Sequence, residues 1–127
     1  KDIMITGKKI PTIKSNESIK NATKVINTKK LGLVVILEKG FIKGILTDGD
    51  ARRSIQNYNK NEEVTKFMTN KPQIIGESSS ASKALSIMNE KKITSLLVVL
   101  DRDIKKGKKA KLKGIIHIHS LLQYGVK

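Results

Sequence analysis

An internal repeat constrains the fold more than any other feature of this 127-residue chain. The segment SIKNATKVINTKKLGLVVIL at 18–37 matches SASKALSIMNEKKITSLLVVL, which starts at residue 80. Further along, KGIL at 43–46 matches KGII at 113–116. A period of about sixty residues predicts two copies of one supersecondary unit. Each copy is too small to bury both faces of a sheet alone, so we expect the two to pack together.

Both copies predict the same order of elements: strand, helix, strand, strand, helix. In the first copy, the apolar residues at 19, 22, 25 and 26 have the spacing of one face of a helix. In the second copy, the apolar residues at 81, 84, 85, 87 and 88 have the same spacing, and they follow serines that suit the N-cap of a helix. The continuous apolar runs at 33–37 and 96–100 indicate strands buried on both faces. Glu38, Lys39 and Gly40 predict a turn back into a second strand at 41–46.

The fold class that follows is α/β (α+β), with two β-α-β-β-α repeats related by a pseudo-twofold axis. We place the first repeat at 1–56, a polar linker at 57–66 and the second repeat at 67–127. The linker is expected to end in a short helix. The pair Ile3-Met4 corresponds to Phe67-Met68 at the start of each repeat.

The net charge of +15 leaves two interpretations open. A basic surface can bind nucleic acid, but only three of the 26 basic residues are Arg, and aromatic residues, which stack on bases, make up 3%. A solvated lysine-rich surface is therefore favoured over a nucleic-acid-binding adaptor. Lysines concentrate only in DIKKGKKAKLKG at 103–114, which contains eight residues absent from the first copy. We expect this loop to be mobile and dispensable, since its apolar residues are few (Ile104, Ala110 and Leu112).

Several functional classes are disfavoured by what the chain lacks. It has no cysteine, no apolar run of 18 residues and no signal-peptide pattern. These observations predict a cytoplasmic protein without disulfides or a membrane span. No nucleophile–base–acid set and no phosphate-binding P-loop is visible, so we expect no catalytic residues and no cofactor. Because the sequence starts at Lys1, we expect a piece of a longer protein.

The stretch GILTDGDARR at 44–53 carries the densest chemistry. A buried strand ends at Leu46, and the helix that follows begins with polar residues. Helix N-termini attract anions, and we expect the hydroxyl, the acids, the glycine and the arginines there to form a ligand site: Thr47, Asp48, Gly49, Asp50, Arg52 and Arg53. Alternatively, Thr47 and Asp48 only cap the helix and the arginines only solvate it.

The second copy, GIIHIHSLLQ at 114–123, differs at the same positions. His117 stands where Thr47 stands, and Ser120 replaces Asp50. His117 and His119 are close enough in sequence to share a metal ion, but no acid or cysteine completes a ligand set, so no metal is expected. We expect one histidine to bind a phosphate or carboxylate of the ligand, and the other to pack against or cap the last helix.

These residues resemble tandem cystathionine-β-synthase (CBS) domains over essentially the whole chain. Within that family they are similar to the C-terminal regulatory tails of bacterial arabinose 5-phosphate isomerases. The matching positions are Asp2–Met4, Gly7, Ile10–Pro11, Gly44–Arg53, Ile93–Ser95 and Gly114–Leu122.

The resemblance implies a regulatory module that binds a nucleotide between its repeats, with an upstream sugar-isomerase domain. Arabinose 5-phosphate isomerases interconvert ribulose 5-phosphate and arabinose 5-phosphate on the way to the lipopolysaccharide sugar Kdo. The similarity to this subgroup suggests CMP-Kdo as the ligand. The resemblance also implies that Asp50 reads a ribose diol. It implies a base held by Ile75, Ile93, Thr94 and Ser95, although plain strand packing remains open for the isoleucines. It suggests a homodimeric module and a tetrameric parent. A generic adenine-nucleotide sensor of another enzyme or transporter is the alternative.

Overall fold

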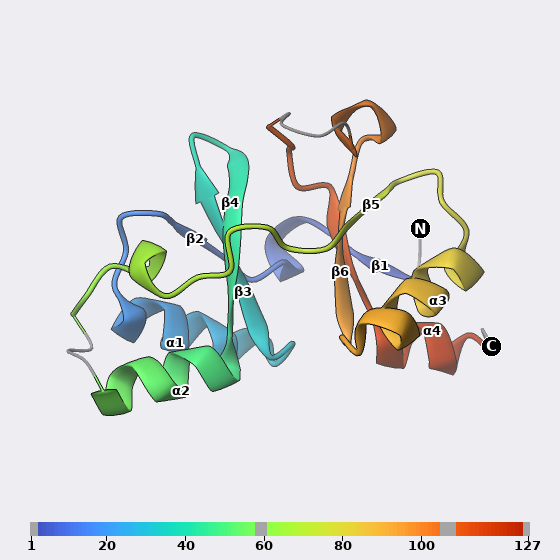
Figure 1. Cartoon of the computed structure of the whole chain (residues 1–127). Coiled ribbons are helices and arrows are strands. Elements are labelled where there is room, and N and C mark those ends of the chain that lie inside the picture. The colour runs from blue at the N-terminus through green and yellow to red at the C-terminus, as the bar shows by residue number, and fades with distance from the viewer. Residues whose placement is uncertain (1–2, 58–60, 105–108, 126–127) are drawn as a thin grey trace. The chain divides into compact units, whose positions relative to one another are not determined.

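The computed structural model describes residues 3–57, 61–104 and 109–125. The chain divides into two compact units (Figure 1): unit 1 combines Lys1–Gly7 with Gln73–Lys127, and unit 2 is Lys8–Pro72. Each unit contains the predicted order of strand, helix, strand, strand and helix, so the α/β fold class is confirmed. Among the helices in the described part of the chain, none is long and apolar enough to cross a membrane.

Unit 2 is built on a three-stranded sheet of order β2-β3-β4. The edge strand β2 (Thr12–Lys14) runs parallel to β3 (Leu33–Glu38), and β4 (Phe41–Thr47) runs antiparallel to it. A two-residue turn joins β3 to β4, and both of its residues have positive φ, 53° at Lys39 and 84° at Gly40. This is the backbone geometry that suits the right-handed twist of a hairpin.

Two helices cover one face of this sheet and lie side by side in Figure 1. Helix α1 (Ile19–Lys29) begins at Ser18, whose hydroxyl accepts a hydrogen bond from the Asn21 N–H at 3.2 Å. Helix α2 spans Asp48–Asn57. The core between sheet and helices consists of Ile13, Ile19, Ala22, Ile26, Val34, Ile36, Leu46, Ala51 and Val64. Val64 belongs to a short 3-10 helix (Val64–Lys66), so the end of the predicted linker packs into the unit.

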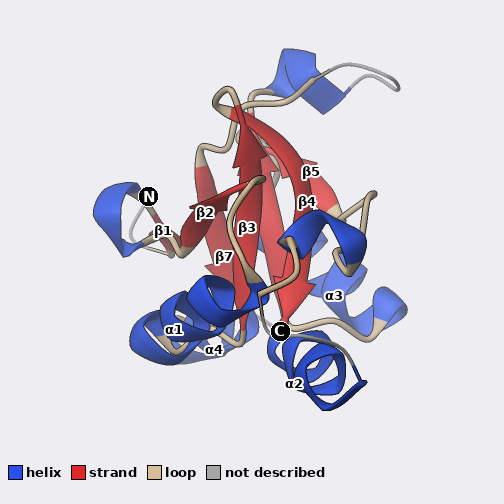
Figure 2. Ribbon diagram, turned by 90° about the vertical axis from the view of Figure 1, so that its left-hand side faces the viewer, coloured by secondary structure: helices blue, strands red, loops and turns tan. Residues whose placement is uncertain are grey.

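Unit 1 carries a four-stranded sheet of order β1-β7-β6-β5, and Figure 2 separates its strands from its helices by colour. The strands are β1 (Met4–Ile5), β5 (Ile74–Gly76), β6 (Ser95–Val99) and β7 (Gly114–His117). Helix α3 (Ala81–Lys91) begins at the N-cap Ser80, as the serines predicted, and α4 (Ile118–Gln123) ends the described chain. Leu97 and Val99 on one face of β6 are as buried as Leu96 and Val98 on the other, which confirms burial of both faces.

The sheets of both units are extended by a segment from the start of the opposite repeat. In unit 1, β1 pairs antiparallel with β7 through Met4–Ile116 and Ile5–Ile115. In unit 2, Thr69 forms the corresponding bridge with Ile45, with N–H···O distances of 2.8 and 3.1 Å. The boundaries of the compact units therefore differ from those of the sequence repeats: Lys1–Gly7 of the first repeat belong to unit 1, and the start of the second repeat, up to Pro72, belongs to unit 2.

Glycines make both of these approaches possible. A Cβ at Gly44 would overlap the Thr69 carbonyl oxygen, and a Cβ at Gly114 would overlap the Met4 side chain. The two glycines occupy the same place in KGIL and KGII. Their shared role is to admit a neighbouring segment to the surface of the strand.

The lysine loop of unit 1 is anchored at both described ends, by a buried acid that the sequence analysis did not anticipate and by Ala110, one of the few apolar residues named there. A short 3-10 helix (Asp101–Ile104) precedes it and turns Asp103 inward, leaving that side chain buried at 6% exposure. Its Oδ2 accepts a hydrogen bond from the Lys111 N–H at 3.4 Å, and Ala110 is 7% exposed. The predicted mobility at residues 105–108 lies outside the described residues.

Candidate functional site

The first predicted cluster lies at the junction of β4 and α2 in unit 2. Thr47 is the last residue of β4, and its Oγ1 accepts a hydrogen bond from the Asp50 N–H at 3.2 Å. Thr47 is therefore the N-cap of α2, as the capping interpretation expects. Its hydroxyl hydrogen is not used in that bond and stays available to donate to a ligand.

Charged side chains of this cluster pair with one another along α2. Asp48 Oδ2 lies 3.3 Å from Arg52 Nη1, and Asp50 Oδ1 lies 2.5 Å from Arg53 Nη2. The two acids and two arginines thus sum to zero charge. The Arg53 guanidinium lies beside Gly49, where a side chain is absent. Exposed ion pairs of this kind are worth at most about 1 kcal/mol, so each pair opposes the approach of an anionic ligand only weakly.

Helix α2 turns this polar face outward because its other face enters the core. Ala51 is fully buried, and Ser54 is buried at 6% exposure. The Ser54 hydroxyl donates to the Asp50 carbonyl oxygen at 2.8 Å, so it has a partner inside the helix. The Asp50 side chain remains 30% exposed, which leaves its second carboxylate oxygen within reach of a ligand.

The corresponding junction of β7 and α4 lies in unit 1. His117 is the N-cap of α4: its Nδ1 accepts a hydrogen bond from the His119 N–H at 3.2 Å. The two rings meet edge to face with centroids 4.7 Å apart. Burial, and secondarily the charge of His119, lower the pKa of His117 from its usual 6.5. The ring is therefore neutral at pH 7, and its proton is carried by Nε2 because Nδ1 is the acceptor.

Thr94 and Ser95 lie beside His117. The Thr94 carbonyl accepts a hydrogen bond from the Ile118 N–H at 2.8 Å, and Ser95 is the direct cross-strand partner of His117. The Ser95 hydroxyl oxygen is buried and has no hydrogen-bond partner among the described residues.

The two predicted isoleucines pack in the hydrophobic core of unit 1. Ile75 is 3% exposed, and Ile93 is half-buried against the same cluster. The structure therefore groups Thr47 to Arg53 in unit 2, and Thr94, Ser95, His117 and His119 in unit 1.

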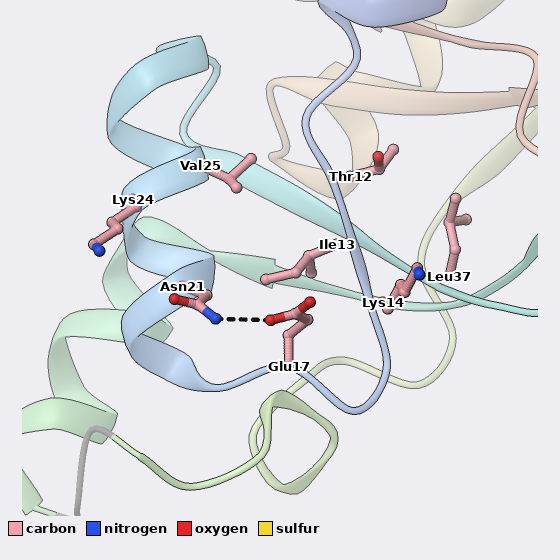
Figure 3. Close-up of a pocket in the computed structure, with 8 residues that line it drawn as sticks. All are labelled: Thr12, Ile13, Lys14, Glu17, Asn21, Lys24, Val25 and Leu37. Carbon is pink, nitrogen blue, oxygen red and sulfur yellow. Dashed lines mark hydrogen bonds between the residues drawn. The ribbon is translucent and has the colours of Figure 1, made fainter.

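Sequence reasoning missed two concave regions. A groove of about 610 Å³ runs along the edge strand β2 and α1 of unit 2 (Figure 3). Asn21 and Glu17 are hydrogen-bonded there at 2.7 Å. A cavity of about 370 Å³ in unit 1 lies between Met4, Ile75 and Ile116 and the loop that precedes α3. Of the predicted site residues, only Ile75 lines either region, and no local pattern in the sequence announces a groove formed by side chains from separate elements. The described residues contain no group of three or more potential metal ligands.

The family model for the CBS domain matches residues 1–57 and again residues 63–127. The arabinose 5-phosphate isomerase KdsD of Yersinia pestis is 38% identical over 98% of this chain and 37% of its own length. KdsD of Francisella tularensis is 32% identical over 96% of the chain and 36% of its own length. The chain thus spans little more than a third of these curated relatives.

Solved structures share the fold. A putative signal-transduction protein with CBS domains from Burkholderia ambifaria has a TM-score of 0.73 and 26% identity, over 91% of this chain and 81% of its own. CBSX2 in complex with AMP has a TM-score of 0.78 and 19% identity, over 97% and 92%. PAE2072 from Pyrobaculum aerophilum, also complexed with AMP, has a TM-score of 0.74 and 16% identity, over 88% and 82%.

Proposed function

Since the chain belongs to the CBS domain family, we propose that it is the regulatory, nucleotide-binding module of an arabinose 5-phosphate isomerase. The similarity to KdsD enzymes supports this, because it runs through almost the whole chain at 32–38% identity. The catalytic activity would belong to an upstream sugar-isomerase domain of the parent enzyme. We further propose a cytoplasmic location, a homodimeric module and a tetrameric parent.

The observation that carries nucleotide binding is the junction of β4 and α2. It combines a hydroxyl whose hydrogen is not used in the helix cap (Thr47), a carboxylate with a second oxygen (Asp50) and a cation in a surface ion pair (Arg53). A ribose diol needs an acceptor, and a phosphate needs donors and positive charge. Related folds support the same class of ligand, since CBSX2 and PAE2072 were solved with AMP and the MgtE cytosolic domain with ATP.

CMP-Kdo is the ligand that we propose within this class. The two junctions differ in a way that suits a ligand with one ribose and one sugar acid. The junction in unit 2 retains the acidic acceptor Asp50, whereas the junction in unit 1 has Ser120 at that position and adds His117. Two identical adenosines would call for the same groups at both junctions.

Titration calorimetry with CMP-Kdo, CMP, AMP and ATP tests the proposal. We expect CMP-Kdo to bind at least about ten-fold more tightly than CMP, since only the former presents the sugar carboxylate. Tighter binding of AMP or ATP than of CMP-Kdo would favour the second candidate, a generic adenine-nucleotide sensor. The AMP- and ATP-bound structures of related fold are the observation behind that candidate. Absence of binding by all four would contradict both.

A further inference from the structure

The cavity of about 370 Å³ in unit 1 is lined largely by apolar side chains from the sheet, the start of α3 and the opening segment. These side chains are Ile3, Met4, Ile75, Ala81, Val98 and Ile116. Each has a counterpart in unit 2, because the two repeats share their sequence pattern and their strand register. The counterparts, in the same order, are Phe67, Met68, Ile13, Ile19, Ile36 and Leu46.

In unit 2 these counterparts pack with Val64. The Val64 side chain is fully buried and belongs to their core cluster. The backbone of the same segment is bound as well. The Val64 N–H donates to the Glu17 carbonyl oxygen at 3.0 Å. The Ile19 N–H donates to the Glu62 carbonyl oxygen at 2.9 Å. A short segment thus closes the core of unit 2 through one apolar side chain and two backbone hydrogen bonds.

The corresponding groups of unit 1 are open. The two backbone groups that bind the segment in unit 2 correspond to the Ser79 carbonyl oxygen and the Ala81 N–H. Among the described residues, neither group has a hydrogen-bond partner. Ile19 and Leu46 are fully buried in unit 2. Their counterparts in unit 1, Ala81 and Ile116, are only half-buried. The cavity therefore combines an apolar wall with one backbone acceptor and one backbone donor.

Position along the chain identifies what would fill this cavity. Val64 lies three residues before Phe67, and Phe67 corresponds to Ile3. The position three residues before Ile3 is the one directly before Lys1. Under the proposed function, that position belongs to the chain that arrives from the upstream domain.

We infer that the residues directly before Lys1 in the parent enzyme dock into this cavity of unit 1. An apolar side chain, the equivalent of Val64, fills the cavity, and the backbone around it binds the Ser79 carbonyl and the Ala81 N–H. The inference rests on the proposed function for the source of the segment, which joins the upstream domain to the module. The connection is then part of the core of unit 1, and a change in the packing of unit 1 reaches the upstream domain through packed side chains.

An N-terminal extension of the chain tests the docking. The extension Asn-Glu-Glu-Val copies residues 61–64 and places a valine directly before Lys1. The matched control, Asn-Glu-Glu-Ser, differs only in the side chain that should fill the cavity. Thermal denaturation should give a melting temperature about 4 °C higher for the valine extension, because only this chain buries a further apolar side chain. Equal melting temperatures would overturn the inference.

Amide hydrogen exchange, followed by NMR, locates the contact. The Ala81 amide should exchange at least about ten-fold more slowly in the chain with the valine extension than in the serine control. The Ile19 amide, which is already bonded in unit 2, should exchange equally in both. A higher melting temperature without slower exchange at Ala81 would overturn the inference, since the valine would then bind elsewhere. Slowing that grows with protein concentration would also overturn it, because the occupant would be a second copy of the chain.

Calorimetry with CMP-Kdo, CMP and AMP separates this inference from the proposed function. Docking of the segment predicts equal nucleotide affinities for the two extended chains. Weaker binding by the valine extension would overturn the docking and assign the cavity to the nucleotide. Absence of nucleotide binding by both chains would refute the proposed function, whereas slower exchange at Ala81 would still establish the docking.

Discussion

The junctions of β4 with α2 and of β7 with α4 use the same backbone device with different chemistry. In both, the last residue of the strand caps the helix with its side chain, and both capping distances are 3.2 Å. In unit 2, two ion pairs surround the cap, whereas in unit 1 a neutral histidine forms the cap and a buried serine lies beside it. A satisfied backbone therefore leaves the surrounding side chains free to differ between the two repeats.

The strands that lead to the two caps, β4 and β7, each contain a glycine that lies against a neighbouring segment, and the two neighbouring segments differ. Substituting these glycines should have the largest effect on the free energy of unfolding. Gly44→Ala drives a Cβ into the Thr69 carbonyl, which is backbone, so we expect a loss of about 3 kcal/mol in the free energy of unfolding. For Gly114→Ala the closest atoms belong to the flexible Met4 side chain and the Ile5 carbonyl oxygen lies farther away, so we expect a smaller loss of about 2 kcal/mol.

Chemical denaturation of both variants measures this difference. Gly49→Ala is the control, because its Cβ reaches only the end of the Arg53 side chain and alanine favours a helix. If Gly114→Ala lowered the free energy of unfolding as much as Gly44→Ala, the glycines of β4 and β7 would be packed equally tightly, which would contradict this prediction.

Asp50→Ala tests the chemistry of the first junction. Loss of a hydrogen bond to a charged group should cost about 1.5–3 kcal/mol of binding free energy for CMP-Kdo, or AMP, while the fold stays intact. Calorimetry measures the affinity and circular dichroism the fold. Glu38→Ala is a matched control, since Glu38 is also paired with a basic residue (Lys43) but lies on the hairpin away from the junction. Equal affinities in wild type and Asp50→Ala would remove Asp50 from the site.

Asp103→Ala tests the contrast between the two strand connections, a two-residue turn in unit 2 and the lysine loop in unit 1. Because Asp103 is buried and accepts the Lys111 N–H, we expect its loss to cost about 1–2 kcal/mol of unfolding free energy. The earlier expectation of a dispensable loop predicts no change. Thermal and urea denaturation of the variant, beside Glu38→Ala, distinguish the two outcomes.

The smallest expected effect is the pH dependence of the second cap. The folded state lowers the pKa of His117, so the unfolded chain takes up the proton first as pH falls. Stability is therefore complete above pH 6.5, the usual pKa, and falls as pH drops from there through the lower pKa of the folded state. The loss should stay within about 1 kcal/mol, the value of a helix cap.

Urea denaturation between pH 7.5 and 5 measures this slope. His117→Asn should flatten it, because the new cap does not titrate. The cap of α2, a threonine, should contribute no slope in this range. An unchanged slope in His117→Asn would assign the pH dependence to another group.

Most of the fold was predictable because the signals are local. Periodicity located α1 and α3, and continuous apolar runs located β3 and β6. The strand expected before each of these helices lies at β2 and β5. The pairing of β1 with β7 escaped prediction, since two residues at one end of the chain carry no sign of a partner 110 residues away. The burial of Asp103 escaped for a different reason, because a charged residue in a lysine-rich loop is expected to be solvated.

The motifs GILTDGDARR and GIIHIHSLLQ predicted polar residues at both junctions, but not how each one is used. That His117 is the capping histidine depends on the backbone at Ile118 and His119, which the sequence does not reveal. The ion pairs of Arg52 with Asp48 and of Arg53 with Asp50 were not predicted either, although spacings of four and three residues suit a helix. The unpartnered hydroxyl of Ser95 became visible only once its burial was known.

The exchange of opening segments bears on the ancestry of this chain. A single repeat standing alone would keep its own hairpin, but its sheet would lack the segment that Met4–Ile5 or Thr69 supplies. A second copy of the same repeat, offering its own opening segment in return, would complete both sheets at once. This reciprocal exchange is the topology of a domain-swapped dimer. The present chain thus has the connectivity of two swapped protomers joined end to end.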